Sequence, residues 1–557
     1  MESRMLNLPS LLRRLDPQVE RVLRHQVMDA SHPDHGAFVL PETGMPTADH
    51  TAGGAATLSL CLAVLMEGSG HRGVAETLDR AEAAVVALRR LQRPTGLIDL
   101  PKVDYDSPPD TAFMVQAACP VLALARERAA SGDASGQRVA GALEGFVRSA
   151  ATGIVGRGFR TPNHRWVVCS ALAWAMTLLP DFDALPYVES ILAEGIDINS
   201  EGVYSERSAG IYDTVCNRAL RIMADHLDRP ELLDHVRANL DYCLGMLDTD
   251  GSILTAVSRR QDHGLSMTPS QMIDSLYDMA VRDGRGDYAA AADLIFDADL
   301  GASVYWPASW LALRPGNSGD EVPRTPLPET LERFMPETAV WRVRERDTSF
   351  AALSETSGFL TVRHGRAAIR KVGVRGSYFH RSVFIPETLE QTDRGVRLRY
   401  EAKAHRKPGW DLPLGRPVEF DHPEEYYRVA QTEREQYSLP ELFIEVAIDR
   451  VSDGLDLHVQ TIGGYDRIAF VAEFWFEPGG RCTMAGREVS AVAGERVLLT
   501  EGYAEVEIGD DRLAVGPGGG DHTLAAMLEQ GEAVGAFLVQ IPMMTPVDQT
   551  LSMRWGS

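Results

Sequence analysis

The chain has 557 residues, which is too long for a single hydrophobic core and predicts two or three domains. Its composition, 44% hydrophobic and 24% charged, is that of a globular protein, and its apolar runs are too short to span a membrane. A net charge of −24, with no basic stripe to offset it, argues against general binding of nucleic acid.

The six cysteines are scattered singly, and no CxxC or Cys/His ligand spacing occurs. Buried free thiols are therefore expected, and neither a disulfide framework nor a zinc site is predicted. Residues 1–9 lack a charged segment followed by an apolar one, so we expect a cytoplasmic protein without a signal peptide. The sequence does not indicate an oligomeric state.

The first half of the chain has a helical pattern, with apolar residues three and four apart, as in Val139, Leu143 and Phe146. Proline and glycine separate the segments, and no fixed-period repeat argues for a solenoid. The predicted helices span residues 11–28, 52–66, 72–91, 110–129, 135–152, 164–178, 184–194, 209–227, 229–246, 268–282, 286–298 and 303–313. About a dozen helices with short links predict an α/α toroid over residues 1–313.

A segment rich in proline and glycine begins at Arg314, and residues 314–338 are predicted to be a linker. Beyond it the pattern alternates between apolar and polar residues, as in residues 441–448 and 455–462, with glycine turns between the runs. Many short strands of this kind predict an antiparallel β-sandwich over residues 339–557. The expected fold is therefore an N-terminal (α/α) toroid followed by a C-terminal antiparallel β-sandwich.

Polar side chains gather where the predicted helices begin. Asn163 and His164, followed by Arg165 and Trp166, precede a very apolar helix, and the positive end of a helix attracts an anion such as a carboxylate. Asn163 is also a plausible N-cap, so a purely structural role is an equal alternative.

A second group of polar residues follows about forty residues later. Tyr204, Glu206 and Tyr212 lie around Ser208, which we expect to cap a helix that begins at Ala209. A tyrosine in a first turn more often packs than reacts. Two such helix starts, however, can lie side by side at one end of the toroid, and we call this end the rim.

Two further segments contribute to the same predicted rim. Arg259, Arg260 and Gln261 occupy a loop, where guanidinium groups can grip carboxylates with paired hydrogen bonds, although a solvated charged loop is an even alternative. Asp110 opens the helix after Ser107, where it is also an ordinary helix-start residue. In the β half, His380, between Tyr378 and Arg381, is the best candidate to face the helical domain.

These residue types suit the removal of the C5 proton of a uronic acid. The neighbouring carboxylate already carries negative charge, so an amide or an arginine must offset the charge that builds up on it. A histidine or tyrosine takes the proton, and a tyrosine hydroxyl protonates the departing O4 oxygen. This chemistry needs no metal and no covalent nucleophile. The sequence has neither a GxSxG elbow nor a glycine-rich phosphate loop, so no cofactor is predicted.

The order of the domains, with Asn-His opening a helix and Tyr-x-Glu and a further Tyr roughly fifty residues later, resembles the heparinase II/III-like polysaccharide lyases, which include alginate and oligoalginate lyases. The resemblance implies that Asn163 neutralises the uronate carboxylate and that His164 is the base or a charge stabiliser. It implies that Tyr212 is the acid, or both acid and base, and that His380 is the histidine of the β domain. Glu206 is followed by Arg207 instead of glycine, which leaves the choice between Tyr204 and Tyr212 open.

The predicted function is that of a lyase that cleaves an acidic poly- or oligosaccharide at O4 of a uronic acid by β-elimination. The predicted catalytic residues are Asn163, His164, Tyr212 and His380. The predicted substrate-binding residues are Tyr204, Glu206, Arg165, Trp166, Arg259, Arg260, Gln261 and Asp110. One alternative is a toroid glycoside hydrolase, with an acid and a base drawn from Asp110, Glu206, Asp213 and Asp250. The other is a non-catalytic carbohydrate-binding protein that uses Trp166, Trp306 and Trp310 as stacking platforms.

Overall fold

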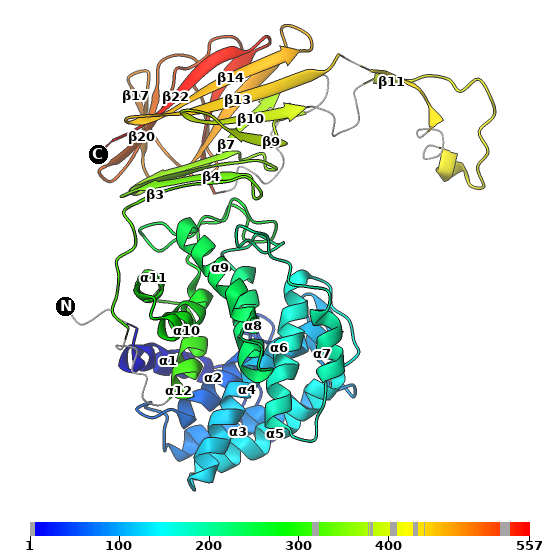
Figure 1. The fold of residues 1–557 in the computed structure, drawn as a ribbon, viewed down its shortest axis with the longest axis vertical. Helices are drawn as coiled ribbons and strands as arrows, with labels where there is room; N and C mark the ends of the chain where they lie inside the picture. The colour runs from blue at the N-terminus through cyan, green and yellow to red at the C-terminus, as the bar shows by residue number, and fades with distance from the viewer. Residues whose placement is uncertain are drawn as a thin grey trace. The chain divides into compact units, whose positions relative to one another are not determined.

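The computed structural model describes residues 6–314, 322–376, 378, 382–401, 409–426, 433–438, 440–523 and 535–556. The chain divides into two compact units, Met1–Pro328 and Glu329–Ser557, which we call the α domain and the β domain (Figure 1). Strand β3 (Thr330–Met335) begins inside the range 314–338 that was predicted to be a linker, so the β domain starts earlier than its alternating pattern indicated.

The described part of the α domain contains twelve α-helices. They are α1 (Leu8–Leu23), α2 (Gly53–Leu65), α3 (Ala75–Arg90), α4 (Pro108–Ala130), α5 (Ala134–Ile154), α6 (Pro162–Leu178), α7 (Leu185–Leu192), α8 (Tyr212–His226), α9 (Leu232–Met246), α10 (Ile273–Asp283), α11 (Gly286–Ala298) and α12 (Tyr305–Ala312). A short hairpin of β1 (Ile98–Leu100) and β2 (Asp104–Ser107), which the sequence pattern did not indicate, precedes α4.

The helices form two layers. Each even-numbered helix packs against the next, from α2 through α4, α6, α8 and α10 to α12, and α12 returns to α2, which closes an inner ring. The odd-numbered helices flank this ring, as α3 packs on α2, α5 on α4 and α9 on α8. The predicted α/α toroid is confirmed.

The inner helices are buried on all sides, which explains their composition. Every residue of α8 from Asp213 to Ala224 is buried, and so is every residue of α10 from Ile273 to Ala280. Polar residues in these helices are therefore removed from water and need partners within the protein. Arg218, for example, pairs with Asp274 of α10 through two hydrogen bonds of 2.7 and 3.1 Å.

Two helix starts differ from the prediction. Helix α6 has Thr161 as its N-cap, so Asn163 is the second residue of the helix and does not cap it. Helix α8 begins at Tyr212 and not at Ala209. The Ser208 hydroxyl still accepts a hydrogen bond from the Tyr212 amide at 3.1 Å, so its capping function is retained from a position outside the helix.

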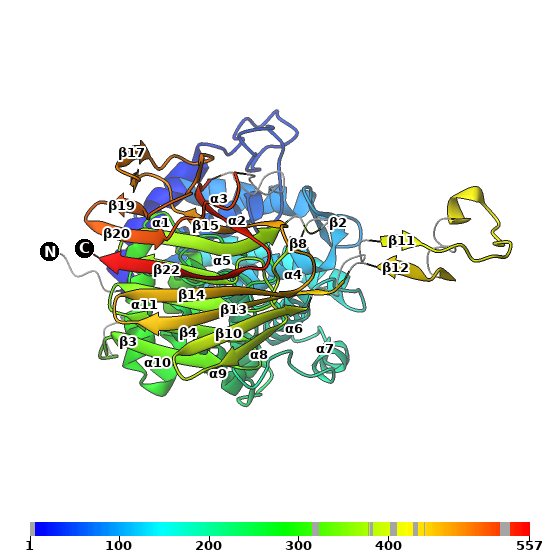
Figure 2. The same cartoon turned by 90° about the horizontal axis from the view of Figure 1, so that it is seen from above.

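The described strands of the β domain form two nine-stranded sheets. Figure 2 shows these strands from above. In order, the first sheet is β17 (Arg487–Ser490), β16 (Arg481–Met484), β19 (Ala504–Ile508), β20 (Asp511–Gly516), β22 (Asp548–Gly556), β14 (Gly454–Gly463), β13 (Leu442–Val451), β10 (Gly395–Glu401) and β9 (Thr388–Gln391). The second is β18 (Arg496–Leu498), β21 (Phe537–Met544), β15 (Ala469–Phe476), β7 (Ala367–Gly376), β6 (Leu360–His364), β5 (Thr348–Leu353), β4 (Val340–Glu345) and β3, with β8 (Ser382–Val383) beside β7. Strands β11 (Gly409–Asp411) and β12 (Gln436–Ser438) pair separately.

One hydrophobic core joins the inner faces of the two sheets. It includes Val446 and Leu457 from the first sheet and Phe474 and Val372 from the second. Alternate residues of β13 are buried, as the alternating sequence predicts for a strand with one face in the core. The antiparallel sandwich is confirmed, except that β18 pairs with β21 in parallel.

All six cysteines are free and buried. Among the residues described, none of the helices combines the length and the apolar character that crossing a bilayer requires.

Candidate active site

The N-terminal ends of four inner helices meet at one end of the toroid. His50, just before α2, stacks on Phe113 of α4 with ring centres 4.4 Å apart, and Phe113 meets His164 of α6 edge-on at 6.3 Å. Across the same end, Glu206, before α8, contacts Asn163. Helix N-termini carry partial positive charge, so four of them at one place favour an anionic ligand.

Glu206 is the residue on which the polar groups of this end converge. One of its carboxylate oxygens accepts hydrogen bonds from the side-chain nitrogen of Asn163 at 2.7 Å and from the Asn163 backbone amide at 3.2 Å. The other oxygen accepts from Nη1 of Arg260 at 2.5 Å. Burial raises the pKa of the Glu206 carboxyl, while the bonds from Asn163 and the charge of Arg260 oppose the rise.

Asn163 is fully buried, and its amide nitrogen also donates to the Thr161 hydroxyl at 3.0 Å. Both hydrogens of the amide are therefore used within the protein. The Asn163 amide can donate to a substrate carboxylate, as predicted from the sequence, only if its hydrogen bond to Thr161 or to Glu206 is broken. Its oxygen Oδ1 has no hydrogen-bond partner among the described residues.

The two candidate tyrosines have different environments. Tyr204 is 2% exposed, and its hydroxyl donates to Oδ1 of Asn217 at 3.0 Å. Burial raises the pKa of Tyr204 well above its usual value. Tyr212 is half-buried, and the guanidinium of Arg260 lies 4.4 Å from the centre of its ring. Of the two, Tyr212 is therefore the tyrosine beside the charged groups, whereas the Tyr204 hydroxyl is bound inside the core.

His164 lies on the same rim and is neutral at pH 7. Burial lowers its pKa to about 4, and the positive charge of Arg260 adds to the effect. Its Nδ1 has no hydrogen-bond partner among the described residues. Arg260 thus pairs with Glu206, lies over the ring of Tyr212 and lowers the pKa of His164.

Asp110 and His50 form a second titratable pair at this end. The nearest nitrogen of His50 is 3.8 Å from an Asp110 oxygen, and the Ser107 hydroxyl donates to the other oxygen at 2.5 Å. Burial lowers the pKa of His50 and raises that of Asp110. His50 was not among the predicted site residues, although Asp49-His50 precedes an apolar helix in the same way as Asn163-His164 does.

Several predicted residues have other positions. Trp166 is fully buried and donates from its indole nitrogen to Asp197 at 2.8 Å, so it is not a stacking platform. Arg165 lies on the Trp166 ring and pairs with Asp197 at 3.1 Å, which directs it away from the rim. Arg259 and Gln261 are exposed beside Arg260. His380 lies outside the described residues.

A buried network of hydrogen bonds connects the loops and the start of α8 behind the rim. Asp262 accepts hydrogen bonds from Ser208 at 2.9 Å and from Ser258, which ties the loop of Arg260 to the start of α8. Asn239 donates to Asp213 at 3.0 Å and accepts from Asn217 at 2.7 Å. Asp213 is fully buried, and burial raises its pKa to about 7.

A possible metal-ligand group lies in the β domain and not at this rim. In the described part of the chain, Asp347, His364 and Asp511 each offer a ligand atom, and these atoms lie within 4.8 Å of one another. His364 is buried, and its Nδ1 is 2.7 Å from the Thr348 hydroxyl.

No family model matches the chain, and no curated protein matches its sequence. Solved structures do match. A xanthan lyase from Paenibacillus has a TM-score of 0.53 at 10% identity, over 98% of this chain and 57% of the lyase. A heparinase III has a TM-score of 0.52 at 10% identity, over 100% of this chain and 87% of the other. A Streptomyces coelicolor chondroitin AC lyase, solved in complex with chondroitin sulphate, has a TM-score of 0.51 at 14% identity, over 98% of this chain and 79% of the lyase.

The chain has the fold of these polysaccharide lyases. At such identities the likeness concerns the arrangement of the elements, a helical toroid followed by antiparallel sheets. This chain spans little more than half the length of the xanthan lyase.

Proposed function

We propose that the protein is a polysaccharide or oligosaccharide lyase that cleaves the bond at O4 of a uronic acid by β-elimination. One observation carries the proposal. Half-buried Tyr212 lies against Arg260, which also pairs with Glu206 beside Asn163 and acts on neutral His164. The lyase fold of the solved structures supports the same class of reaction.

The reaction breaks two bonds and forms a double bond. A base removes the proton from C5, the electron pair forms C4=C5, and the C4–O4 bond breaks as O4 leaves with a proton from an acid. Negative charge builds up on the uronate carboxylate during the first step. The products are a 4,5-unsaturated uronate and a chain with a free hydroxyl at the former O4.

Arg260 is the group best suited to offset the charge on the carboxylate. It is half-buried, and a guanidinium can hold a carboxylate with two parallel hydrogen bonds. Arg259 and Gln261 are exposed on the same loop and are assigned to neighbouring sugar hydroxyls or carboxylates. The Asn163 side-chain amide donates a hydrogen bond to Glu206. Asn163 contacts the substrate if the uronate carboxylate replaces Glu206 as the acceptor of this bond.

Tyr212 is assigned as the acid that protonates O4, and His164 as the base or as a neutral stabiliser of the developing charge. Burial keeps His164 unprotonated at neutral pH, so its ring can accept a proton. Tyr204 is unsuited to the role of acid because its hydroxyl already donates to Asn217 inside the core.

Three of the four candidate carboxylates provide little support for a hydrolase. A glycosidase needs two carboxyl groups about 5–10 Å apart with access to the sugar. Asp213 is fully buried and bonded to Asn239, and Asp250 accepts hydrogen bonds from Ser252 in a turn. Glu206 is paired with Arg260.

The proposal is tested by incubating the protein with uronate polymers and oligomers of several linkages. The absorbance of the double bond conjugated to the carboxylate is followed, together with reducing ends. Equal increases in both support elimination, and new reducing ends without absorbance refute it in favour of hydrolysis. Arg260→Gln is expected to abolish most turnover, whereas Arg285→Gln serves as the matched control, because Arg285 also stacks on a tyrosine and pairs with carboxylates, at Tyr288, Asp241 and Asp287.

A further inference from the structure

A cavity of about 330 Å³ lies among the helices of the inner ring. Helices α4, α6, α8, α10 and α12 all contribute to its lining. Three of the eight tryptophans of the chain, Trp174, Trp306 and Trp310, line it. We call it the tryptophan pocket.

The tryptophan pocket is distant from the candidate active site. In α6, Asn163 belongs to the active-site rim and Trp174 lines the pocket eleven residues later, which is about 16 Å along the helix axis. In α8, Tyr212 and His226 occupy opposite ends of the helix, about 21 Å apart. The candidate active site therefore lies at the N-terminal ends of α6 and α8, and the pocket is lined from the C-terminal part of α6 and from the middle and C-terminal part of α8.

The walls of the pocket are mainly apolar and aromatic. Trp174 and Trp306 are half-buried, so part of each indole remains accessible. His226 stacks on Trp174 with ring centres 4.8 Å apart, and burial lowers the pKa of His226 to about 4, so it is uncharged at neutral pH. Flat apolar walls of this kind suit the face of a flat or puckered six-membered ring.

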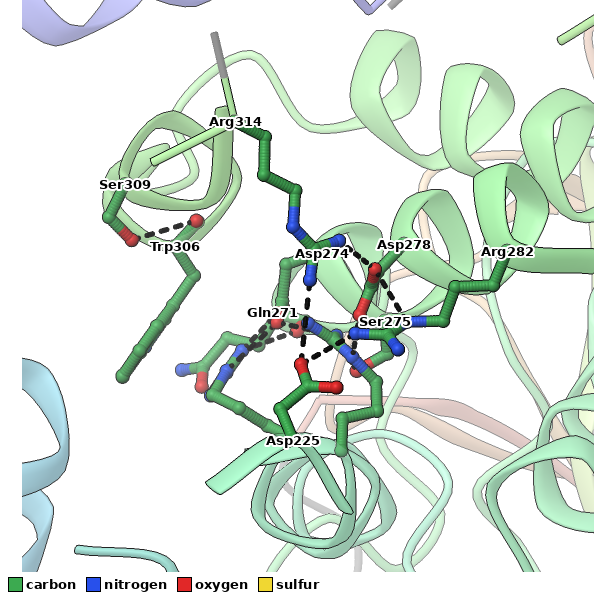
Figure 3. Close-up of polar contacts among 11 residues, drawn as sticks. Asp225, Gln271, Asp274, Ser275, Asp278, Arg282, Trp306, Ser309 and Arg314 are labelled. Carbon is green, nitrogen blue, oxygen red and sulfur yellow. Dashed lines mark hydrogen bonds and ion pairs between the residues drawn. The ribbon is translucent and has the colours of Figure 1, made fainter. Parts of the chain in front are cut away.

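Charged residues form a continuous network along one side of the pocket (Figure 3). Asp278 accepts hydrogen bonds from Arg221 at 2.7 Å, from Arg282 at 2.9 Å and from Arg314. Burial alone would raise the pKa of Asp278, but these three arginines lower it, so the carboxylate is ionised.

The same network includes two more aspartates and a fourth arginine. Asp274 pairs with Arg218 at 2.7 Å and with Arg221 at 3.0 Å. Asp225 pairs with Arg282 at 2.6 Å and only loosely, at 3.5 Å, with Arg314. Four guanidinium groups thus face three carboxylates, so the described residues of this network carry a net charge of one positive.

Two of these arginines have donors to spare at the pocket. Arg218 is 3% exposed and lies over the Trp306 ring at 4.2 Å, and within the described residues its Nη1 has no acceptor. Arg314 lies over Trp310 at 4.6 Å, and its Nε likewise has no acceptor among those residues. A ligand carboxylate can take up these donors and the unbalanced charge.

We propose that the tryptophan pocket binds a small molecule made of a six-membered ring that carries a carboxylate. The ring lies against Trp174 and Trp306, and the carboxylate accepts hydrogen bonds from Arg218 and Arg314. A sugar acid and an aromatic acid share this chemistry. The proposal is independent of the lyase activity.

The test is isothermal titration calorimetry of the full chain with sodium glucuronate, sodium benzoate and glucose as probes. Saturable binding of either acid supports the proposal, and the acid that binds identifies the source as a sugar acid or an aromatic acid. Glucose is expected to bind at least about tenfold more weakly, because it lacks the charged hydrogen-bond acceptor. Equal binding of glucose and glucuronate, or no binding of either acid, overturns the proposal.

Variants assign the binding to the pocket. Ala123→Leu adds bulk to the cavity from α4 and removes none of its charged groups, and Arg314→Gln removes one guanidinium while Asp278 keeps Arg221 and Arg282. Each is expected to weaken binding at least about tenfold. Arg260→Gln at the candidate active site and Arg285→Gln, a stacked and paired arginine elsewhere, are expected to leave it unchanged. Binding that is lost in Arg260→Gln and kept in Ala123→Leu overturns the assignment.

Discussion

The two tyrosines of the Tyr-x-Glu…Tyr segment allow a test with a matched pair of variants. Tyr212→Phe and Tyr204→Phe each remove one hydroxyl and nothing else. If Tyr212 protonates O4, its hydroxyl matters for turnover, and because no described residue bonds to it, its loss costs little stability. The Tyr204 hydroxyl has the opposite role, because it satisfies Asn217 in the core.

The expected magnitudes follow from these contacts. Loss of a general acid lowers kcat by about 10²- to 10⁴-fold, which is about 3–5 kcal/mol of transition-state stabilisation. Tyr204→Phe leaves Oδ1 of Asn217 buried without its donor, which costs about 1–3 kcal/mol of folding stability. We therefore expect Tyr212→Phe to be stable and inactive, and Tyr204→Phe to be active with a melting temperature lowered by a few degrees.

The assay measures the absorbance of the unsaturated product on a uronate substrate that the wild type cleaves, together with thermal unfolding of each variant. Arg260 keeps its pairing with Glu206 in both variants, so differences in turnover report on the hydroxyls. Loss of turnover in Tyr204→Phe, with turnover kept in Tyr212→Phe, refutes the assignment of Tyr212 as the acid. Near-normal turnover in both variants refutes the assignment of the site.

Three further predictions concern stability. Burial raises the pKa of Asp213 from 3.8 to about 7, so between these pH values the folded state binds a proton that the unfolded state releases, and stability falls as pH rises from 3.8 to 7. The melting temperature of Asp213→Asn minus that of the wild type should therefore be larger at pH 8 than at pH 5. An equal difference at both pH values would contradict this prediction. Burial lowers the pKa of His164 from 6.5 to about 4, so stability falls as pH drops from 6.5 to 4, and His164→Gln should reduce the loss of melting temperature between pH 7 and pH 4.5. Trp166→Phe removes the hydrogen bond to Asp197 and should lower the melting temperature without changing KM, whereas a raised KM in a stable variant would restore Trp166 to the substrate site.

The sequence by itself determined the architecture and the end of the toroid that carries the polar residues. Periods of 3.6 and 2 residues separate helices from strands without knowledge of the partners, because they arise from the geometry of each element. Asn163, Glu206 and Arg260, which are far apart in the chain, were predicted to share a rim, the first two because they lie at helix starts and Arg260 because it lies in a loop where a guanidinium can bind carboxylates. Their hydrogen bonds bring them together as expected.

Only the tertiary structure decided which side chains face the rim. Tyr204 and Tyr212 look alike in sequence, yet the contact with Asn217 buries one and the contact with Arg260 marks the other. Trp166 follows Asn163 and His164 directly but turns toward Asp197, and His50 joins the site through Phe113. The direction of a side chain at a helix start depends on the neighbouring helix in the ring, and the periodicity of one helix does not indicate which residues that neighbour presents.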